Sequence, residues 1–217
     1  MSLAIFDLDH TLIAADSGDQ WIEFLTEQGA LDAANCLPQL RRFQDEYDAG
    51  VLDIHEFLGF HAKTLASHDS ATLKQWRIKY MEDRIKPLIS AKARALVEQH
   101  RGCGHTLIMI TATIHFVASP IASTFGMEHL LASEATLVNG QFDGTLSGVP
   151  CFQGGKVDRL QAWIRKQDKS LHDSWFYSDS HNDLPLLSKV DHPVAVDPDP
   201  TLAEHASRHG WSIVKLA

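Results

Sequence analysis

Three short apolar runs in the sequence each end in polar side chains able to carry chemistry. These runs span residues 2–7, 105–111 and 174–179. Buried strands of parallel sheets read as continuous apolar stretches. Ligands of open parallel sheets bind at the carboxyl ends of the strands. The chain is therefore predicted to gather distant polar residues at one edge of a parallel sheet.

Helical and strand patterns alternate along most of the chain. Helices are expected at about residues 91–100, 115–125, 154–166 and 184–188, with a further strand at 193–196. A hairpin is expected at 133–146, because Asn139-Gly140 is typical of a type I′ turn. We therefore predict an α/β fold, a Rossmann-like parallel sheet core with helices on both faces.

Residues 17–84 interrupt this alternation with helical periodicity and almost no strand signal. Trp21, Phe24 and Leu25 share one predicted face, and breaks fall near Gly50 and residues 67–70. The pattern predicts about four helices. We expect two domains: a catalytic core of residues 1–15 and 87–217, and an inserted all-helical cap of residues 16–86.

The polar ends of the runs predict a metal site. Asp7, Asp9, Asp179 and Asp183 would place up to four negative charges in one crevice, and each close pair costs about 1 to 4 kcal/mol without a counter-charge. Magnesium takes oxygen ligands from carboxylates, water and substrate phosphate. We therefore expect Mg²⁺ there, with the phosphate further held by Thr111, by Lys156 and by backbone N–H groups.

The Asp7-Leu8-Asp9 spacing places two carboxyl groups near one phosphorus atom with separate tasks. Asp7 is expected to be the nucleophile that forms an aspartyl-phosphate. Asp9 is expected to protonate the leaving oxygen and then to take a proton from the attacking water. Positioning and charge neutralisation by Mg²⁺ and Lys156 would supply most of the rate.

The charge balance limits the partners. With 19 basic and 28 acidic residues the formal charge is −9, which disfavours nucleic acid and anionic lipid surfaces. No apolar run approaches the roughly 20 residues needed to cross a bilayer, and no signal peptide is apparent. We expect a cytoplasmic protein that acts on a small phosphorylated metabolite, and the sequence carries no signal for an oligomeric state.

The motifs together resemble the haloacid dehalogenase-like hydrolases, in particular the phosphoserine-phosphatase-like branch with a four-helix cap. Residues 6–12 (Phe-Asp-Leu-Asp-His-Thr-Leu) look like the first motif, Asp-x-Asp-x-Thr. The second, third and fourth motifs are matched by residues 111–113, by Lys156 and by residues 178–183. The order of the motifs and the helical insertion also match, so the resemblance covers essentially the whole chain.

This resemblance implies roles for individual residues. Asp7, the backbone carbonyl of Asp9 and Asp179 would ligate Mg²⁺, and Asp183 would support the metal site. The phosphate would be held by Lys156, by Asn182 and by Thr111 with the adjoining Ala112. The family's acid nine residues after the nucleophile corresponds to Asp16, and the family's carboxylate-binding arginine corresponds to His61.

Histidine cannot make the two-pronged contact by which arginine holds a carboxylate. We therefore expect an amino-alcohol phosphate such as histidinol phosphate to fit better than phosphoserine. More ordinary interpretations are that His61 packs inside the cap, that Asp16 starts a helix and that Thr113 caps the helix after it.

Two other functions share the same residues. The first is transfer of the phosphoryl group from Asp7 to an acceptor alcohol, which a cap that excludes water would favour. The second is a non-catalytic binding module that keeps the fold. The presence of both Asp7 and Asp9 favours catalysis, since loss of either would be expected in a binding module.

Overall fold

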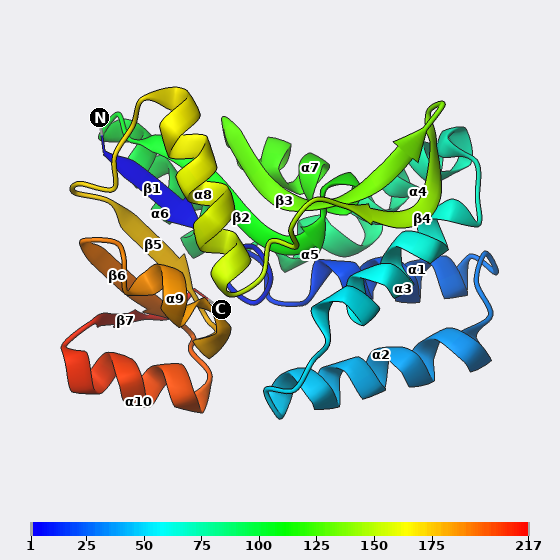
Figure 1. The fold of residues 1–217 in the computed structure, drawn as a ribbon, viewed down its shortest axis with the longest axis horizontal. Helices are drawn as coiled ribbons and strands as arrows, with labels where there is room; N and C mark the ends of the chain where they lie inside the picture. Colours follow the sequence, from blue (N-terminus) through cyan, green and yellow to red (C-terminus); the bar gives the residue numbers. More distant parts are fainter. Residues whose placement is uncertain (1, 217) are drawn as a thin grey trace.

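The computed structural model describes residues 2–216; residues 1 and 217, the outer limits of the predicted core, lie outside this range. Within it, seven strands form one sheet in the order β4-β3-β2-β1-β5-β6-β7 (Figure 1). The strands are β1 (Leu3–Phe6), β2 (Thr106–Ile114), β3 (His129–Val138), β4 (Gln141–Ser147), β5 (Trp175–Ser178), β6 (His192–Val196) and β7 (Ser212–Val214). All neighbours pair in parallel except β3 and β4. The predicted α/β sheet is confirmed.

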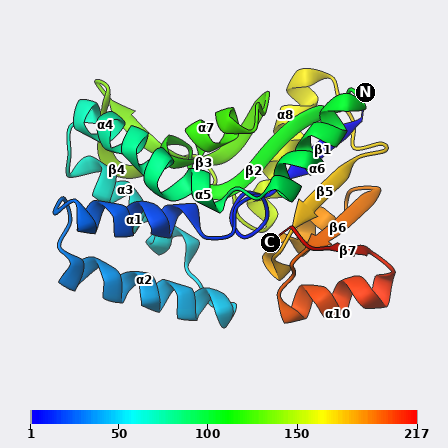
Figure 2. The same ribbon diagram turned by 180° about the vertical axis from the view of Figure 1, so that it is seen from behind.

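Helices cover both faces of this sheet. Helix α6 packs on one face, where Ala93 and Val97 join the cluster around Phe6, and α8, α9 and α10 cover the other face around Ile5 and Phe176 (Figures 1 and 2). The core helices are α5 (Lys86–Leu88), α6 (Ala91–Gly102), α7 (His115–Thr124), α8 (Gly154–Gln167), the 3-10 turn η2 (His181–Asp183), α9 (Leu184–Leu187) and α10 (Pro200–His209). Helix α10 and strand β7 had no counterpart in the sequence prediction.

The inserted segment is helical, as expected. It forms α1 (Ser17–Glu27), α2 (Ala33–Asp48), α3 (Ile54–Ala66), α4 (Ser70–Tyr80) and the π-helical turn η1 (Met81–Ile85). Each of α1 to α4 begins after an aspartate whose carboxylate accepts a backbone N–H of the first turn: Asp16, Asp32, Asp53 and Asp69. Trp21, Phe24 and Leu25 are buried on one face of α1 as predicted. The four aspartates thus mark the start of every long helix of the cap.

The β3–β4 hairpin leaves the core and extends beside the cap (Figure 1). Its turn is Asn139-Gly140, with φ of 52° and 78°, which confirms the predicted turn. At the tip, Ser70 at the start of α4 donates its hydroxyl to the Gly140 carbonyl and its N–H to Gln141 Oε1. The core therefore touches the far side of the cap as well as its base.

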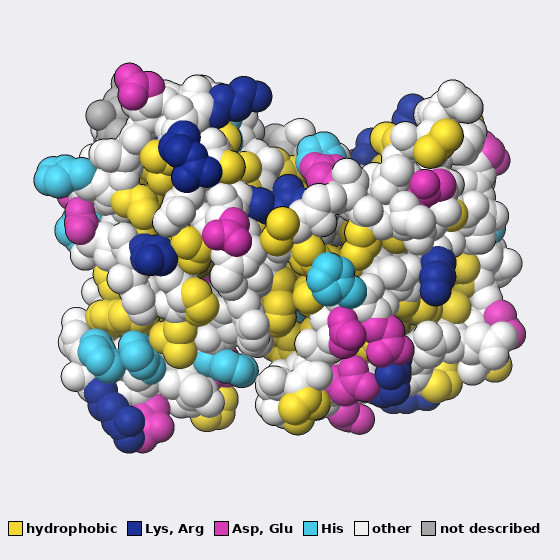
Figure 3. Space-filling view, viewed as in Figure 1, with side chains coloured by type: hydrophobic (Ala, Val, Ile, Leu, Met, Phe, Trp, Pro, Cys, Tyr) yellow, Lys and Arg dark blue, Asp and Glu magenta, His cyan; other side chains and the backbone are white. Residues whose placement is uncertain are grey.

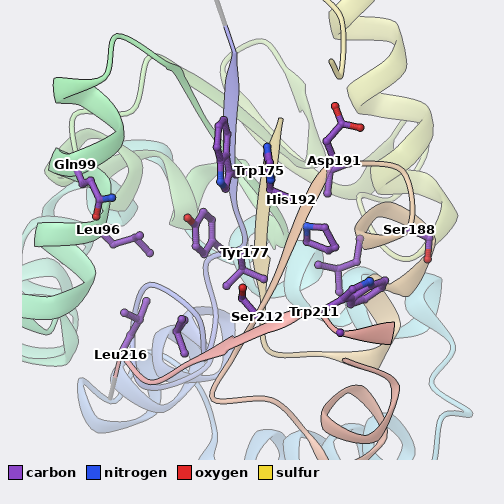
Figure 4. A pocket seen from close by; sticks show the side chains of 16 residues that line it. Leu96, Gln99, Trp175, Tyr177, Ser188, Asp191, His192, Trp211, Ser212 and Leu216 are labelled. Atoms are coloured by element: carbon purple, nitrogen blue, oxygen red, sulfur yellow. The ribbon is translucent and has the colours of Figure 1, made fainter. Parts of the chain in front are cut away.

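The face covered by α6 is left partly open over β5, β6 and β7. A hollow of about 620 Å³ lies there, with Trp175, Tyr177, His192 and Trp211 around it (Figure 4). Asp191 is the acidic residue among the side chains that line it. Within the described residues, no helix combines the length and the apolar character needed to span a membrane.

Candidate active site

The predicted site residues other than His61 meet in a second cavity, at the carboxyl ends of β1, β2 and β5. This cavity measures about 330 Å³ and lies between the core and the cap. It is smaller than the hollow over β5 to β7, but it holds the chemistry-bearing side chains. The predicted residues that line it are Asp7, Asp9, Asp16, Thr111, Ala112, Lys156, Asp179, Asn182 and Asp183.

A buried lysine joins the ends of β1 and β5. Lys156 Nζ lies 2.7 Å from Asp7 Oδ1 and 2.7 Å from Asp183 Oδ2, and all three side chains are less than a tenth exposed. Burial lowers the pKa of Lys156, but Asp183 and Asp7 outweigh it and raise the pKa above its usual value. The ammonium therefore stays charged beside the predicted nucleophile.

Asp179 is fixed by the first loop of the chain. The Thr11 hydroxyl donates to Asp179 Oδ1 over 3.0 Å, and the Asp179 N–H donates to Thr11 Oγ1 over 3.1 Å. Burial, followed by repulsion from Asp183, raises the pKa of Asp179 to about 7. Thr11 belongs to the Asp-x-Asp-x-Thr motif, and the structure gives it a positioning contact that the sequence analysis did not assign.

The carboxyl groups fit a hard cation that shares its coordination with substrate and water. Burial raises the pKa of Asp7 well above its usual value against the pull of Lys156, and Asp183, Asp179 and Asp9 raise it further. This repulsion marks a place where a cation would be stabilised. Among residues 2–216, no three His, Cys, Asp or Glu side chains form a metal cage by themselves. Mg²⁺ needs only one or two carboxylates and completes its shell with water and phosphate oxygens.

Asp9 is held by hydrogen bonds at the first turn of α1. Its carboxylate accepts the Ser17 N–H over 2.7 Å, the Thr113 hydroxyl over 2.7 Å and the Thr111 hydroxyl over 3.3 Å. The interpretation of Thr113 as the cap of α7 is wrong, because Ile114 precedes that helix and no side chain caps it. The β2 register shifts between Ile110 and Ile114, and such irregularities re-aim side chains.

Asp16 and His61 both lie close to Gly18, but they line different cavities. Asp16 caps α1 by accepting the Asp19 N–H over 2.7 Å, and it also lines the cavity. His61 is 5% exposed and lies against Phe57 inside the cap. It lines a small adjoining void rather than the main cavity. Asp16 therefore starts a helix and His61 packs inside the cap, as the more ordinary interpretations state. A role of either residue in substrate binding stays a prediction.

Three contacts at the cavity were missed by sequence reasoning. Tyr47 of α2 places its hydroxyl 2.6 Å from Ser180 Oγ and its ring near Phe152. Gln153 Nε2 donates to Asn182 Oδ1 over 2.7 Å. These pairs are far apart in sequence, so only the folded chain reveals them.

A parallel core whose strand ends present buried carboxyl groups to a helical cap defines a capped α/β hydrolase. The chain belongs to the haloacid dehalogenase-like hydrolases, whose family model matches residues 4–188. It is 37% identical to a histidinol-phosphatase from Neisseria meningitidis serogroup C, over 99% of both chains. It is 28% identical to a phosphoserine phosphatase from Mycobacterium tuberculosis, over 97% of this chain and 69% of that protein. The predicted family is thereby confirmed, and the enzyme is of the phosphatase type.

Solved structures share the fold. A protein of unknown function from Bordetella pertussis Tohama I superposes with a TM-score of 0.94 at 37% identity, over 100% of this chain and 99% of that one. A substrate-bound phosphoserine phosphatase superposes with a TM-score of 0.72 at 17% identity, over 100% of this chain and 93% of that one. The predicted fold, a Rossmann-like core with a helical cap, agrees with both.

Proposed function

We propose that the protein is a magnesium-dependent phosphatase that hydrolyses a small phosphate ester through an aspartyl-phosphate on Asp7. The observation that carries this proposal is the buried contact of Lys156 Nζ with both Asp7 and Asp183, each at 2.7 Å. A charged ammonium held beside a strand-end carboxylate is suited to receive the oxygens of a phosphoryl group. The core domain of residues 1–15 and 87–217 would supply the chemistry, and the cap of residues 16–86 would enclose the substrate.

The reaction has two steps. A carboxylate oxygen of Asp7 attacks phosphorus, the ester P–O bond breaks, and Asp9 gives its proton to the departing alcohol. Water then attacks the phosphorus on Asp7 while Asp9 takes a proton from it, and the bond to Asp7 breaks to release phosphate. Thr113 and Ser17 hold Asp9 at the correct end of the cavity through the bonds described above.

The residues that would hold Mg²⁺ are Asp7, Asp179 and the backbone carbonyl of Asp9, with Asp183 supporting the site through Lys156. When bound, the ion would offset the charge of the phosphate and of the carboxylates. Thr111, Ala112 and Asn182 line the same end of the cavity and would contact the phosphate.

Histidinol phosphate is the substrate that we propose. The relative from Neisseria meningitidis that is 37% identical over 99% of this chain is a histidinol-phosphatase. His61, where phosphoserine phosphatases use arginine for the substrate carboxylate, supports a substrate without that carboxylate.

The test is a screen of phosphate esters with and without Mg²⁺, with Asp7→Asn as the control protein. Histidinol phosphate is expected to be turned over faster than phosphoserine, and a chelator is expected to abolish both activities until Mg²⁺ is restored. Activity that survives in Asp7→Asn would overturn the mechanism, and a strong preference for phosphoserine would overturn the substrate. Added alcohols should yield no new phosphate ester, which separates hydrolysis from phosphotransfer.

A further inference from the structure

The residue before α8 has a backbone conformation that residues with a side chain rarely adopt. Gln153 has φ of 46° and ψ of −120°. The Phe152 carbonyl accepts the Gly155 N–H over 2.8 Å, so residues 152–155 form a turn in which Gln153 is the first central residue. Its angles are those of a type II′ turn, where glycine is the usual residue at that position. Gln153 therefore stands where glycine would fit with less strain.

Glycine is present in this turn, but not at the position that has the positive φ. Gly154 and Gly155 follow directly and already belong to α8. A residue other than glycine in such a conformation lowers stability, and strain of this kind is concentrated at functional sites. The Gln153 side chain therefore needs a role that offsets the strain.

The Gln153 side chain contacts a residue of the active-site cavity. Its Nε2 donates to Asn182 Oδ1 over 2.7 Å. Gln153 itself is exposed and is not among the residues that line the cavity, whereas Asn182 lines it and is 5% exposed. Gln153 therefore acts on the site through Asn182.

This contact decides which atom of the Asn182 amide is left for the substrate. The amide has one acceptor oxygen and one donor nitrogen, and the oxygen is engaged by Gln153. The nitrogen lies 3.4 Å from Ser180 Oγ, which is longer than a typical hydrogen bond. The Asn182 N–H groups therefore remain able to donate to a phosphate oxygen. A reversed amide would place its oxygen against the phosphate instead.

The cavity has few other donors for an anion. Among the described residues, its lining includes nine aspartates but one lysine, and Lys156 is already bonded to Asp7 and Asp183. On the face seen in Figure 3, acidic side chains also gather over α2 and α3. Binding of a phosphate in these surroundings depends on donors that are oriented before it arrives.

We propose that Gln153 is a positioning residue that holds the Asn182 amide with its N–H groups toward the phosphate. The strained turn brings the Gln153 amide to Asn182 Oδ1, which explains why a side chain is kept at a glycine position. This inference rests on the proposed function, in which Asn182 contacts the phosphate.

Two substitutions separate the strain from the side chain. Gln153→Gly removes both, so it should raise the melting temperature by about 2 to 5 °C and still lower kcat/KM on histidinol phosphate about 10-fold. Gln153→Ala keeps a Cβ at the positive φ, so it should lower kcat/KM equally without raising the melting temperature. Wild-type activity in Gln153→Gly would overturn the proposal. So would a loss of activity accompanied by a lower melting temperature in that variant, which indicates a structural role.

The matched control is Asp168→Gly, at the other end of the same helix. Asp168 is exposed and also has a positive φ, of 50°, and the length of α8 places it about 20 Å from the turn at Gln153. This substitution should raise the melting temperature and leave kcat/KM unchanged. A loss of activity in Asp168→Gly as large as that in Gln153→Gly would show that relief of strain alone impairs the enzyme.

A double-mutant cycle tests whether Gln153 acts through Asn182. In the Asn182→Ala background, Gln153→Ala should change kcat/KM by less than about twofold, because the amide that it orients is gone. Full additivity of the two losses would contradict the proposal.

Binding of inorganic phosphate separates this inference from the proposed function. Calorimetric titration of the Asp7→Asn protein with phosphate in the presence of Mg²⁺ needs no turnover. Addition of Gln153→Ala should weaken binding about 10-fold, and the effect should vanish when Asn182→Ala is also present. This result would support the positioning role even if the wild type proved inactive on every ester. Unchanged affinity in Asp7→Asn/Gln153→Ala would refute it even if the protein proved to be a phosphatase.

Discussion

The hydroxyl of Tyr47 on α2 lies 2.6 Å from Ser180 Oγ, which follows β5, and this contact joins the cap to the core at the cavity. A cap that closes over the site excludes water and positions the substrate. We expect Tyr47→Phe to lower kcat/KM about fivefold, the worth of one hydrogen bond of about 1 kcal/mol.

A double-mutant cycle measures this contact directly. Tyr47→Phe, Ser180→Ala and the double variant should show a coupling of about 1 kcal/mol in kcat/KM. Tyr177→Phe removes a hydroxyl that contacts His100 away from the cavity, and it should show no coupling with Ser180→Ala. Additive effects of Tyr47→Phe and Ser180→Ala would contradict a shared contact.

Removal of the Lys156 ammonium should destabilise the fold as well as stop the reaction. Lys156→Met leaves Asp7 and Asp183 buried without a counter-charge, and breaking such a pair costs about 3 to 5 kcal/mol. Urea unfolding measures the loss, and Lys166→Met on the exposed end of the same helix is the control. Addition of Asp7→Asn should restore part of the stability, and a further loss would count against the interpretation.

The turn before Lys156 offers a matched pair of glycines. A Cβ at Gly155 would lie 2.0 Å from the Pro150 carbonyl oxygen, whereas a Cβ at Gly154 would meet nothing within 4 Å. Gly155→Ala must shift backbone, so we expect a destabilisation of about 2 kcal/mol or more and a displaced Lys156 with low activity. Gly154→Ala should fold and react normally. Thermal unfolding of the two variants distinguishes them, and equal melting temperatures would contradict the contact.

Protonation of His61 should oppose folding in acid. Burial holds its pKa at about 4 against 6.5 in an unfolded chain, so only the unfolded state gains the proton as pH falls from 6.5 toward 4. Stability attributable to His61 is therefore present above pH 6.5 and is lost below it, by up to about 3 kcal/mol.

The measurement is urea unfolding of the wild type and of His61→Gln at several pH values from 7.5 to 4.5. Relative to the wild type, the variant should gain about 2 to 3 kcal/mol over this range. His55→Gln, which removes an exposed imidazole from the same helix, is the reference. A constant difference between His61→Gln and the wild type would show that His61 does not titrate as expected.

Much of the core could be predicted because its signals are local. The apolar runs before Asp7, Thr111 and Asp179 identified the central strands, and the rule that ligands bind at strand ends brought their polar residues together. Helix α10 also has local signals that were overlooked: Asp199 caps it, Pro200 begins it and Gly210 ends it. The sequence therefore contains enough local information to predict α10.

The contacts between cap and core could not be predicted in the same way. Tyr47 and Ser180 are 133 positions apart, and their meeting depends on how a separate group of helices sits on the sheet. Asp19 belongs to none of the sequence motifs. A single carboxylate in the first turn of a helix usually does no more than interact favourably with the helix dipole. Only the folded chain shows that its carboxylate lies 3.9 Å from the His61 ring on α3.

The hairpin of β3 and β4 constrains how the enclosure can open. Ser70 is tied to its tip at Gly140 and Gln141, while η1 and α5 lead the chain back from the cap to the core. A swing of the whole cap as one rigid lid would break the contacts at the tip. Lifting the edge that carries α2 breaks the hydrogen bond from Tyr47 to Ser180 and the ring contact of Tyr47 with Phe152. Substrate and product should therefore enter and leave beneath that helix.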